Sequence, residues 1–369
     1  MFTARLTAQP VADVLFPPPP RGLKGRRAEL ATLERAVRSA APARLALVGP
    51  GGCGKSMLAC ALAHHMARAF AGNLHWFRVG AWDFRTVSEM FALRFGTTRG
   101  DGRLPALRRF LRNGGPKLIV LDNHENDRAM ARLLDAFSDT PVTFIITARR
   151  CLLGGVLIFP VTAPLVTSGK SAFPRVASLT RLLRFNPLAL DIADGIVASG
   201  AESSPSLGEE LQKRGITRVT AIEHEDDLPE VALLVDWAWR RLPPESRRML
   251  AVLAHTEGDH VDEESLGKLA RVKPREGALA PLRAFRLVQE PATGRFALHA
   301  VVRHAVLRRT RFSHARMFEH YVTLLERRPE RLLLEQTHLF AAMDHAHRTN
   351  DLQGMMRVMR LVERLDSSE

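Results

Sequence analysis

The stretch Leu45–Ser56, LALVGPGGCGKS, determines what the N-terminal half of this 369-residue chain can be. Its first four residues, Leu45–Val48, are apolar and predict a buried parallel strand. The next eight, Gly49–Ser56, fit the phosphate-loop pattern G-x-x-x-x-G-K-[ST], and helix-forming residues follow from Met57 onward. The pattern therefore stands in the context that its chemistry requires, which is a strand, a glycine-rich loop and then a helix.

The residue types of this loop suit the phosphates of a nucleotide. Glycines let the backbone curl with its amides pointing inward, and the helix that starts near Gly54 adds its positive dipole end. Lys55 can reach the β and γ phosphates, and the Ser56 hydroxyl can ligate Mg²⁺. The alternative, a glycine-rich turn that binds nothing, is disfavoured by the strand and helix around it. The expected nucleotide-binding residues of the loop are Gly49, Pro50, Gly51, Gly52, Cys53, Gly54, Lys55, Ser56 and Met57.

Length and composition set the broad class of the protein. A chain of 369 residues that is 46% hydrophobic can form two or more domains with sizeable cores. Its three cysteines are no disulfide framework, which fits a reducing cytoplasm, where we expect the protein to reside. The first 20 residues lack the features of a secretory signal, and the longest apolar stretch, Leu152–Val166, is too short and too interrupted by glycine and proline to span a bilayer.

The formal net charge of +14 suggests a nucleic-acid or membrane-surface partner. Arginine predominates over lysine, however, and it is spread along the chain as singlets and pairs without interleaved aromatic residues. Solvated arginine-rich faces are therefore the favoured interpretation, and a polyanion site stays open as the alternative.

A second motif lies at Lys117–Asp122, KLIVLD, an apolar run that ends in an acid. A buried parallel strand can present such a carboxylate at the sheet edge where ligands bind, so Asp122 is expected to hold Mg²⁺ through water, as in a Walker B element. The alternative is a strand that ends in a turn-forming Asp-Asn pair. Asn123 stands where a polymer-driving motor often has glutamate, and Glu125 lies three positions past Asp122. This predicts slow hydrolysis unless Glu125 swings in.

A third strand candidate, Val142–Thr147, is followed by Arg149. An arginine at that strand edge could contact the γ-phosphate and sense its loss, although an ordinary surface arginine is the alternative. Further strands are expected at Leu74–Val79 and Val156–Val161. Alternating strands and helices over Arg44–Val161 predict a parallel sheet with helices on both faces.

The rest of the chain is expected to be mostly helical. After two helices that cover 232–254, two shorter helices precede predicted strands at Arg286–Gln289 and Phe296–His299, around a turn at Pro291–Gly294. This succession is typical of a winged helix. We divide the chain into a proline-rich tail at 1–21, a P-loop nucleotide-binding domain at 22–168, a helical subdomain at 169–225, a winged-helix domain at 226–311, and a helical segment at 312–369 that could open a repeat array.

Several blocks, in this order, resemble the STAND class of signal-transduction ATPases of the NB-ARC type, over about residues 22 to 310. The phosphate loop alone is common to many families, whereas the ordered series is much more specific. The blocks are LKGRRAEL (23–30), GPGGCGKS (49–56), LIVLDNHEN (118–126), FIITARR (144–150), RFNPLALDIA (184–193), WAWRRLPPESRRMLAVLA (237–254) and RFALHAVVRHA (295–305).

The resemblance implies roles for individual residues. Arg26 would approach the nucleotide, Arg149 would be the sensor arginine next to Thr147, and Pro187 would pack near the adenine. His299 would touch the β-phosphate of bound ADP and latch the closed state, although a histidine that only packs is the alternative. The chain departs from the family at two positions, with Asn186 in place of glycine and Ala300 in place of aspartate.

These observations predict an α/β P-loop NTPase that acts as an ATP/ADP-switched regulatory ATPase. We expect Lys55, Asp122 and Arg149 to act in slow hydrolysis, with Mg²⁺ held by Ser56 and Asp122. The expected partners are nucleotide and either further copies of the chain in the ATP state or a protein effector, without a membrane. The alternatives are a DNA-acting AAA+ or winged-helix regulator and, less favoured because no acceptor-binding domain is evident, a small-molecule phosphotransferase.

Overall fold

The computed structural model describes residues 16–20, 26–97, 103–113, 115–162, 173–215, 228–256, 260–272 and 276–366. Contacts divide the chain into two units. The first contains residues up to Pro50, Gly54–Thr162 and the segment from Tyr321 onward, and the second contains Gly51–Cys53 and Ala163–His320. Among the described residues, every helix is too short or too polar to cross a bilayer.

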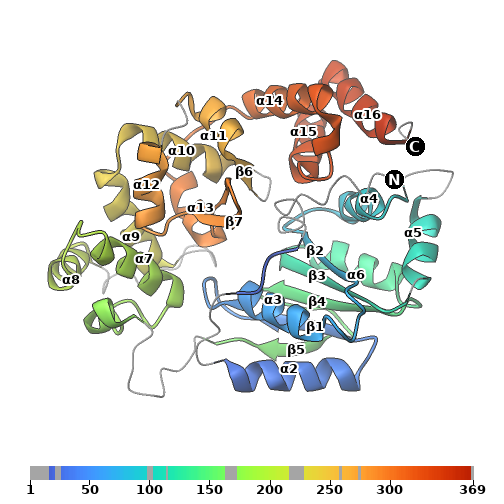
Figure 1. The fold of residues 1–369 in the computed structure, drawn as a ribbon, viewed down its shortest axis with the longest axis horizontal. Coiled ribbons are helices and arrows are strands. Elements are labelled where there is room, and N and C mark those ends of the chain that lie inside the picture. Colours follow the sequence, from blue (N-terminus) through green and yellow to red (C-terminus); the bar gives the residue numbers. More distant parts are fainter. Residues whose placement is uncertain are drawn as a thin grey trace. The chain divides into compact units, whose positions relative to one another are not determined.

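The first unit is built on a parallel five-stranded sheet in the order β2-β3-β4-β1-β5 (Figure 1). The central strands β3 and β4 are buried along almost their whole length, as expected for continuous apolar runs in a parallel sheet covered by helices. The predicted α/β fold is confirmed. The strands are β1 (Arg44–Val48), β2 (Leu74–Arg78), β3 (Lys117–His124), β4 (Val142–Ala148) and β5 (Leu157–Pro160).

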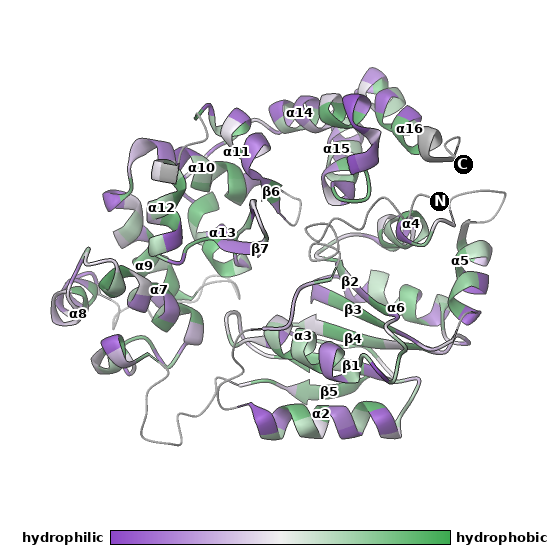
Figure 2. Ribbon diagram, viewed as in Figure 1, coloured by the Kyte–Doolittle hydropathy of each residue, from purple (hydrophilic) through white to green (hydrophobic). Residues whose placement is uncertain are grey.

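Helices surround this sheet, and their burial follows their sequence pattern. In α2, Leu30, Leu33 and Val37 recur on one face and are buried, while Glu34 and Arg35 between them are half-buried and exposed, respectively. Figure 2 shows hydrophobic and hydrophilic residues alternating along this helix. By contrast, α3 buries most of its side chains because it contacts β1, β3 and β4 as well as α2. The helices are α2 (Arg27–Ser39), α3 (Lys55–Met66), α4 (Phe84–Arg94), α5 (Arg103–Arg112) and α6 (Asp127–Ala136).

The predicted alternation of strands and helices fails at one crossover. Residues 149–156, which are all described, connect β4 to β5 without a helix. This segment is too short for a helical crossover and includes Gly154 and Gly155, which interrupt a helix.

The C-terminal helices of the first unit are α15 (Gln336–Arg348) and α16 (Leu352–Asp366), which follow α14 (His314–Arg327) and the 3₁₀ turn η3 (Pro329–Arg331). The guanidinium of Arg357 donates to both carboxylate oxygens of Glu326, at 2.8 and 2.9 Å, and so joins α16 to α14. Helix α15 contacts α4 and thereby packs against the sheet-containing part of the same unit.

The second unit begins with helices and then adds a three-stranded antiparallel sheet in the order β6-β8-β7. Helix α10 contacts α11, α12 and α13. Helices α10, α11 and α12 precede the hairpin β7-β8, which is the order of helices and hairpin that the sequence predicts, whereas β6 was not predicted. The assignment of this region as a winged helix stays a prediction. The elements are η2 (Pro174–Leu179), α7 (Pro187–Ala198), α8 (Ser204–Lys213), α9 (Pro229–Arg241), α10 (Pro244–His255), β6 (Val261–Asp262), α11 (Glu263–Ala270), α12 (Glu276–Ala284), β7 (Gln289–Ala292), β8 (Arg295–Ala297) and α13 (Ala300–Leu307).

The predicted hairpin needs a correction. The strand expected at Arg286–Gln289 lies instead at Gln289–Ala292, and the turn is formed by residues 293 and 294. Gly294 has a φ of 71°, which permits a two-residue turn and pairs Ala292 with Arg295. Proline is tolerated in this strand because β7 is at the edge of the sheet.

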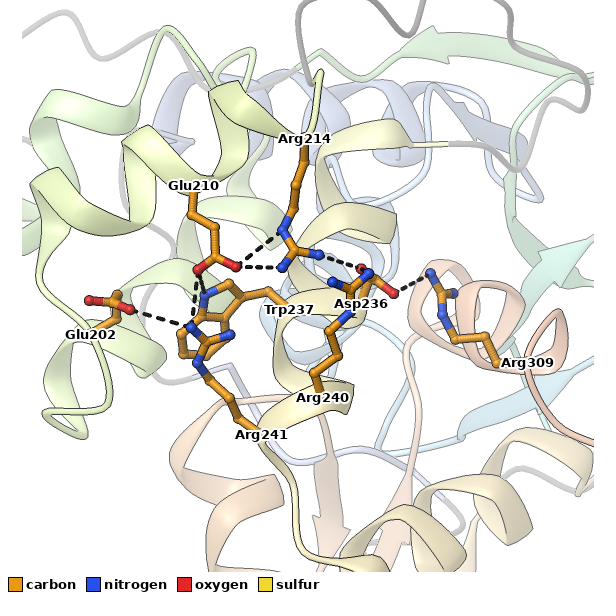
Figure 3. A network of polar contacts seen from close by, with 8 residues as sticks. All are labelled: Glu202, Glu210, Arg214, Asp236, Trp237, Arg240, Arg241 and Arg309. Carbon is orange, nitrogen blue, oxygen red and sulfur yellow. Dashed lines mark hydrogen bonds and ion pairs between the residues drawn. The ribbon is translucent and has the colours of Figure 1, made fainter.

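Two sets of charged contacts hold the helices of the second unit together. Arg286, which follows α12, donates to Asp191 and, at 2.7 Å, to Asp194, both on α7. The second set joins α8, α9 and the residues after α13, as Figure 3 shows. It consists of Glu202, Glu210, Arg214, Asp236, Trp237, Arg240, Arg241 and Arg309.

Candidate nucleotide-binding site

The phosphate loop connects β1 to α3 in the predicted way. Gly52 and Gly54 have φ angles of 73° and 94°, which side-chain-bearing residues rarely adopt. The N–H of Gly49 donates to the carbonyl of Ala148 at 3.3 Å and anchors the start of the loop to β4. The Lys55 ammonium donates to the carbonyls of Gly49 and Pro50, at 2.8 Å each, so the charge of Lys55 lies at the loop itself.

A buried carboxylate lies at the end of β3, beside the start of α3. Asp122 is 2% exposed, and its Oδ1 accepts hydrogen bonds from Ser56 Oγ and from Thr147 Oγ1, at 2.6 Å each. Arg78 Nε lies 3.5 Å from the other carboxylate oxygen, because Arg78 and Asp122 are register partners on β2 and β3. The two residues expected to hold Mg²⁺ therefore lie together. A carboxylate and a hydroxyl are the hard oxygen donors that this ion prefers, so the donor set fits Mg²⁺.

The residues after Asp122 are tied to one another. Asn123 adopts a φ of 58°, and its N–H donates to Thr147 Oγ1 at 2.9 Å. Its side-chain amide donates to Glu125 Oε1 at 2.7 Å, and the N–H of Glu125 donates to the carbonyl of Gly80 at 3.0 Å. The carboxylate of Glu125 is therefore engaged by the residue that stands in the usual place of a water-activating glutamate.

Arg26 lies beside the end of the phosphate loop. It is 5% exposed, and its Nη1 donates to both carboxylate oxygens of Glu29 at 2.9 Å. Its Nη2 donates to the carbonyl of Thr162 at 2.7 Å, and a Cβ placed on Gly54 would be 3.8 Å from this nitrogen. Of the other predicted residues in this unit, Arg149 directly follows β4 and is half-buried, and Met57 is 47% exposed in the first turn of α3.

Pro187 and His299, expected near the nucleotide from the resemblance, belong to the second unit. Pro187 is the first residue of α7, and Asn186 caps that helix. The Oδ1 atom of Asn186 accepts from the N–H groups of Leu188 and Ala189, at 3.0 and 3.1 Å. This capping explains locally why asparagine can stand where the family has glycine.

His299 has a local structural role at the start of α13. Its Nδ1 accepts from the N–H of Val301 at 3.3 Å, and the side chain is half-buried. The ring therefore caps a helix, and its contact with ADP stays a prediction.

Sequence reasoning missed Arg78 as part of the site. Its proximity to Asp122 depends on the register between β2 and β3, which the sequence does not specify. The signal was present, since Arg78 is a charged residue at the end of an otherwise largely apolar strand.

Comparisons with known proteins give a sequence match over part of the chain and several matches among solved structures. No family model matches the chain. A stretch of 99 residues is 36% identical to a protein described as an insertion sequence ATP-binding protein, from Sinorhizobium fredii, and the match covers 26% of this chain and 36% of that protein.

Among solved structures, a Signal Transduction ATPase with Numerous Domains with a tetratricopeptide repeat sensor, from Pyrococcus horikoshii, matches 95% of this chain and 54% of its own length. The TM-score is 0.55 and the identity 19%. Cdc6p from Pyrobaculum aerophilum matches with a TM-score of only 0.35 at 15% identity. The chain thus spans about half of the first structure and about a third of the curated relative. The fold is that of the P-loop NTPases, and the glycine-rich loop lies between β1 and α3 as this fold requires.

Proposed function

We propose that this chain is a nucleotide-dependent switch that binds Mg-ATP, hydrolyses it slowly and alternates between ATP and ADP states. One observation carries the proposal. The Ser56 hydroxyl, which belongs to the last residue of the phosphate-loop motif and to the first turn of α3, lies 2.6 Å from the buried carboxylate of Asp122. A hydroxyl and a carboxylate placed together behind a glycine-rich loop are what a Mg-nucleotide site needs.

Each residue of the first unit then has a defined task. Lys55 binds the β and γ phosphates through its ammonium, and the loop amides bind phosphate oxygens. Mg²⁺ held by Ser56 and Asp122 would offset the phosphate charge. Thr147 orients the Asp122 carboxylate through its 2.6 Å hydrogen bond, and Arg149 senses the γ-phosphate.

The arrangement after β3 supports slow turnover. The carboxylate next in line, Glu125, accepts a hydrogen bond from Asn123 and would have to leave it to activate water. A slow ATPase suits a switch, whose ATP state must persist long enough to be read by a partner. We expect that partner to be a second copy of the chain or a protein effector.

His299 is proposed as the residue that distinguishes the ADP state. Because Nδ1 accepts from Val301, the neutral ring carries its proton on Nε2. That tautomer can donate a hydrogen bond to a phosphate oxygen. Pro187, at the start of α7, is proposed to pack against the adenine.

The test is to identify the nucleotide that copurifies with the chain, by denaturation and chromatography, in the wild type and in Lys55→Ala. Near-stoichiometric ADP in the wild type and none in Lys55→Ala would support the switch, and His299→Ala should then release ADP more rapidly. Titration with Mg-ATP completes the test. A chain that neither retains nucleotide nor binds added Mg-ATP would contradict the proposal.

A DNA-acting ATPase is the second candidate, favoured by the net charge of +14 and by the name of the insertion-sequence relative. The exposed positions of α12, where a winged helix reads DNA, argue against it. They include Gly277 and Ala280, and Arg283 is paired with Glu290 at 3.2 Å. Binding to duplex DNA that weakens steeply with salt would favour the second candidate, because several phosphate contacts release several counterions.

A further inference from the structure

The proline-rich segment Phe16–Pro20 does not extend freely from the first unit but lies against α3 and β2. The Phe16 ring meets His64 of α3 edge-on, with centroids 5.1 Å apart and an interplanar angle of 81°. It also meets Trp76 of β2 edge-on, at 5.9 Å and 88°. Phe16 is thus inserted between two aromatic side chains that come from separate elements of the fold.

The backbone of the segment is bound as well. His64 Nε2 donates to the carbonyl of Pro17 at 2.8 Å. The Cys60 thiol lies 3.5 Å from the same carbonyl and 3.4 Å from that of Pro18. Proline has no N–H, so carbonyl oxygens are the polar groups through which a polyproline backbone can be bound. The His64 ring and the Cys60 thiol both point a donor at these carbonyl oxygens.

We propose that Cys60, His64 and Trp76 form a recognition site for a phenylalanine–polyproline segment, and that residues 16–20 occupy it as a displaceable intramolecular ligand. Aromatic side chains beside hydrogen-bond donors are the usual means of binding polyproline, whose stiff backbone loses little entropy on docking. The ligand here is the sequence FPPPP itself.

The docked segment is held at one end more firmly than at the other. The ring contacts and the bound carbonyls belong to Phe16, Pro17 and Pro18, although Pro20 is half-buried as Phe16 and Pro17 are, and Pro18 and Pro19 are exposed. The contacts are few, and the affinity of the site arises from the tether, which keeps the local concentration of the segment high. A free peptide should therefore compete poorly with the wild-type segment and bind well when that segment is weakened.

Cys60 provides a direct measure of occupancy. It is 5% exposed, and burial, followed by the charge of Asp122, raises the pKa of its thiol to about 12. In the docked state the thiol is therefore buried and its thiolate form is strongly disfavoured. Undocking would expose the thiol to water and lower its pKa toward the ordinary value, so its alkylation would accelerate.

The experiment measures the rate of N-ethylmaleimide labelling at each cysteine of the full chain by peptide mass spectrometry. In Phe16→Ala, labelling of Cys60 should accelerate by about tenfold or more, while labelling of Cys151 stays unchanged. Pro19→Ala is the matched control, because Pro19 is exposed, and it should label as the wild type does. Equal Cys60 labelling in Phe16→Ala and the wild type would overturn the proposal.

A second measurement separates recognition from simple packing. The peptide FPPPP is added to the Phe16→Ala chain, and the peptide APPPP serves as its control. Recognition predicts that FPPPP restores protection of Cys60 in a saturable manner and that APPPP does not. Faster labelling that neither peptide reverses, including labelling caused by a loosened fold, would show that the segment only packs and would refute the recognition site.

Discussion

At the scale of single residues, the site depends on one carboxylate oxygen that accepts hydrogen bonds from two hydroxyl groups. Asp122 Oδ1 accepts from Ser56 on α3 and from Thr147 on β4, while the N–H of Asn123 donates to Thr147 Oγ1. Thr147 is 1% exposed. Its hydroxyl bonds to two residues of β3, Asp122 and Asn123, and so connects β4 to β3 inside the sheet. Thr147 therefore supports the geometry of the site besides any contact it makes with a ligand.

The substitution Thr147→Val tests this role. It removes one donor to Asp122 and leaves the N–H of Asn123 without its acceptor, and a buried unsatisfied group costs about 1–3 kcal/mol. Denaturant unfolding should show a loss of that size, together with weaker Mg-nucleotide binding. Thr147→Ser keeps the hydroxyl and should recover most of the stability and most of the Mg-nucleotide binding. A Thr147→Val chain with wild-type stability and binding would disprove the role.

Asn186 offers a second prediction at this scale, because two helix N–H groups depend on its side chain. Asn186→Ala should lower the free energy of unfolding of the second unit by about 1 kcal/mol, and Asn186→Gly by only a few tenths. Chemical denaturation measures both. A larger loss in the glycine variant than in the alanine variant would contradict the capping explanation.

At the scale of elements, the Glu210 network joins α8 to α9 (Figure 3). The carboxylate accepts from Trp237 Nε1 at 2.6 Å, and it also pairs with Arg214 and Arg241. Burial tends to raise the pKa of Glu210, but its hydrogen bonds to Arg214 and Trp237 and the charges of both arginines lower the pKa overall. A charged Glu210 therefore stabilises the contact between these helices.

The sign of the pH dependence follows from the lowered pKa. Because the folded state favours the charged form, the stabilisation is present above the unfolded pKa of about 4.3 and is lost as the pH falls through the lower folded value. Glu210→Gln should cost about 1 kcal/mol at neutral pH and progressively less in acid. Urea unfolding of the wild type and of Glu210→Gln between neutral and acid pH measures the difference in their free energies of unfolding. A difference that does not change with pH would refute the stabilising role of the charged Glu210.

Arg286 connects α12 to α7 and tests a second contact between elements. Asp194 is 4% exposed, so removing Arg286 leaves a buried carboxylate whose remaining cation is Arg175, with Nη1 3.6 Å away. Arg286→Ala should destabilise the second unit by about 2–4 kcal/mol. Arg283→Ala, a nearby exposed arginine, is the control and should change stability by less than about 1 kcal/mol. Equal effects of the two substitutions would show that the contact with α7 contributes little.

Elements with a strong local signal could be predicted from the sequence. The phosphate loop and the strand that ends in Asp122 carry their pattern in consecutive residues, so the central part of the site was evident. The register between paired strands was not evident from the sequence, because it depends on the turn in a hairpin and on the packing of neighbouring strands in a parallel sheet. Gly294 allowed a tight turn that moved β7 along the chain, and the pairing of β2 with β3 brought Arg78 to Asp122. The docking of Phe16 between His64 and Trp76 depends on contacts between distant residues and was equally invisible.

At the scale of the whole molecule, much of the positive charge is paired. The network in Figure 3 contains four arginines that pair with three acids, and Trp237 donates to one of these acids, Glu210. Arg357 and Arg286 are bound to carboxylates too. Such pairing among the described residues favours solvated or structurally engaged arginines over a continuous surface for a polyanion.

Nucleotide binding should also be visible as a change in the stability of the chain. Mg-ADP that binds the folded state alone should raise the free energy of unfolding by about 2.7 kcal/mol at 100 times its dissociation constant. Differential scanning fluorimetry should show a concentration-dependent rise in the unfolding midpoint for the wild type and none for Lys55→Ala. Omission of Mg²⁺ should reduce the rise if Ser56 and Asp122 hold the ion. A midpoint that Mg-ADP leaves unchanged would contradict nucleotide binding.

The strand order has a consequence for how the protein is made. The strand that leads into the phosphate loop, β1, lies between β4 and β5, so Arg44 pairs with Phe144 and Leu45 with Leu157. A ribosome adds about 5–20 residues per second, so the loop leaves the exit tunnel several seconds before the strands that will flank it. A nascent chain that ends before β4 has a complete phosphate-loop sequence without the strands that flank β1 on both sides. Although the phosphate loop is made early, the strand that leads into it is thus among the last parts of the sheet to be completed.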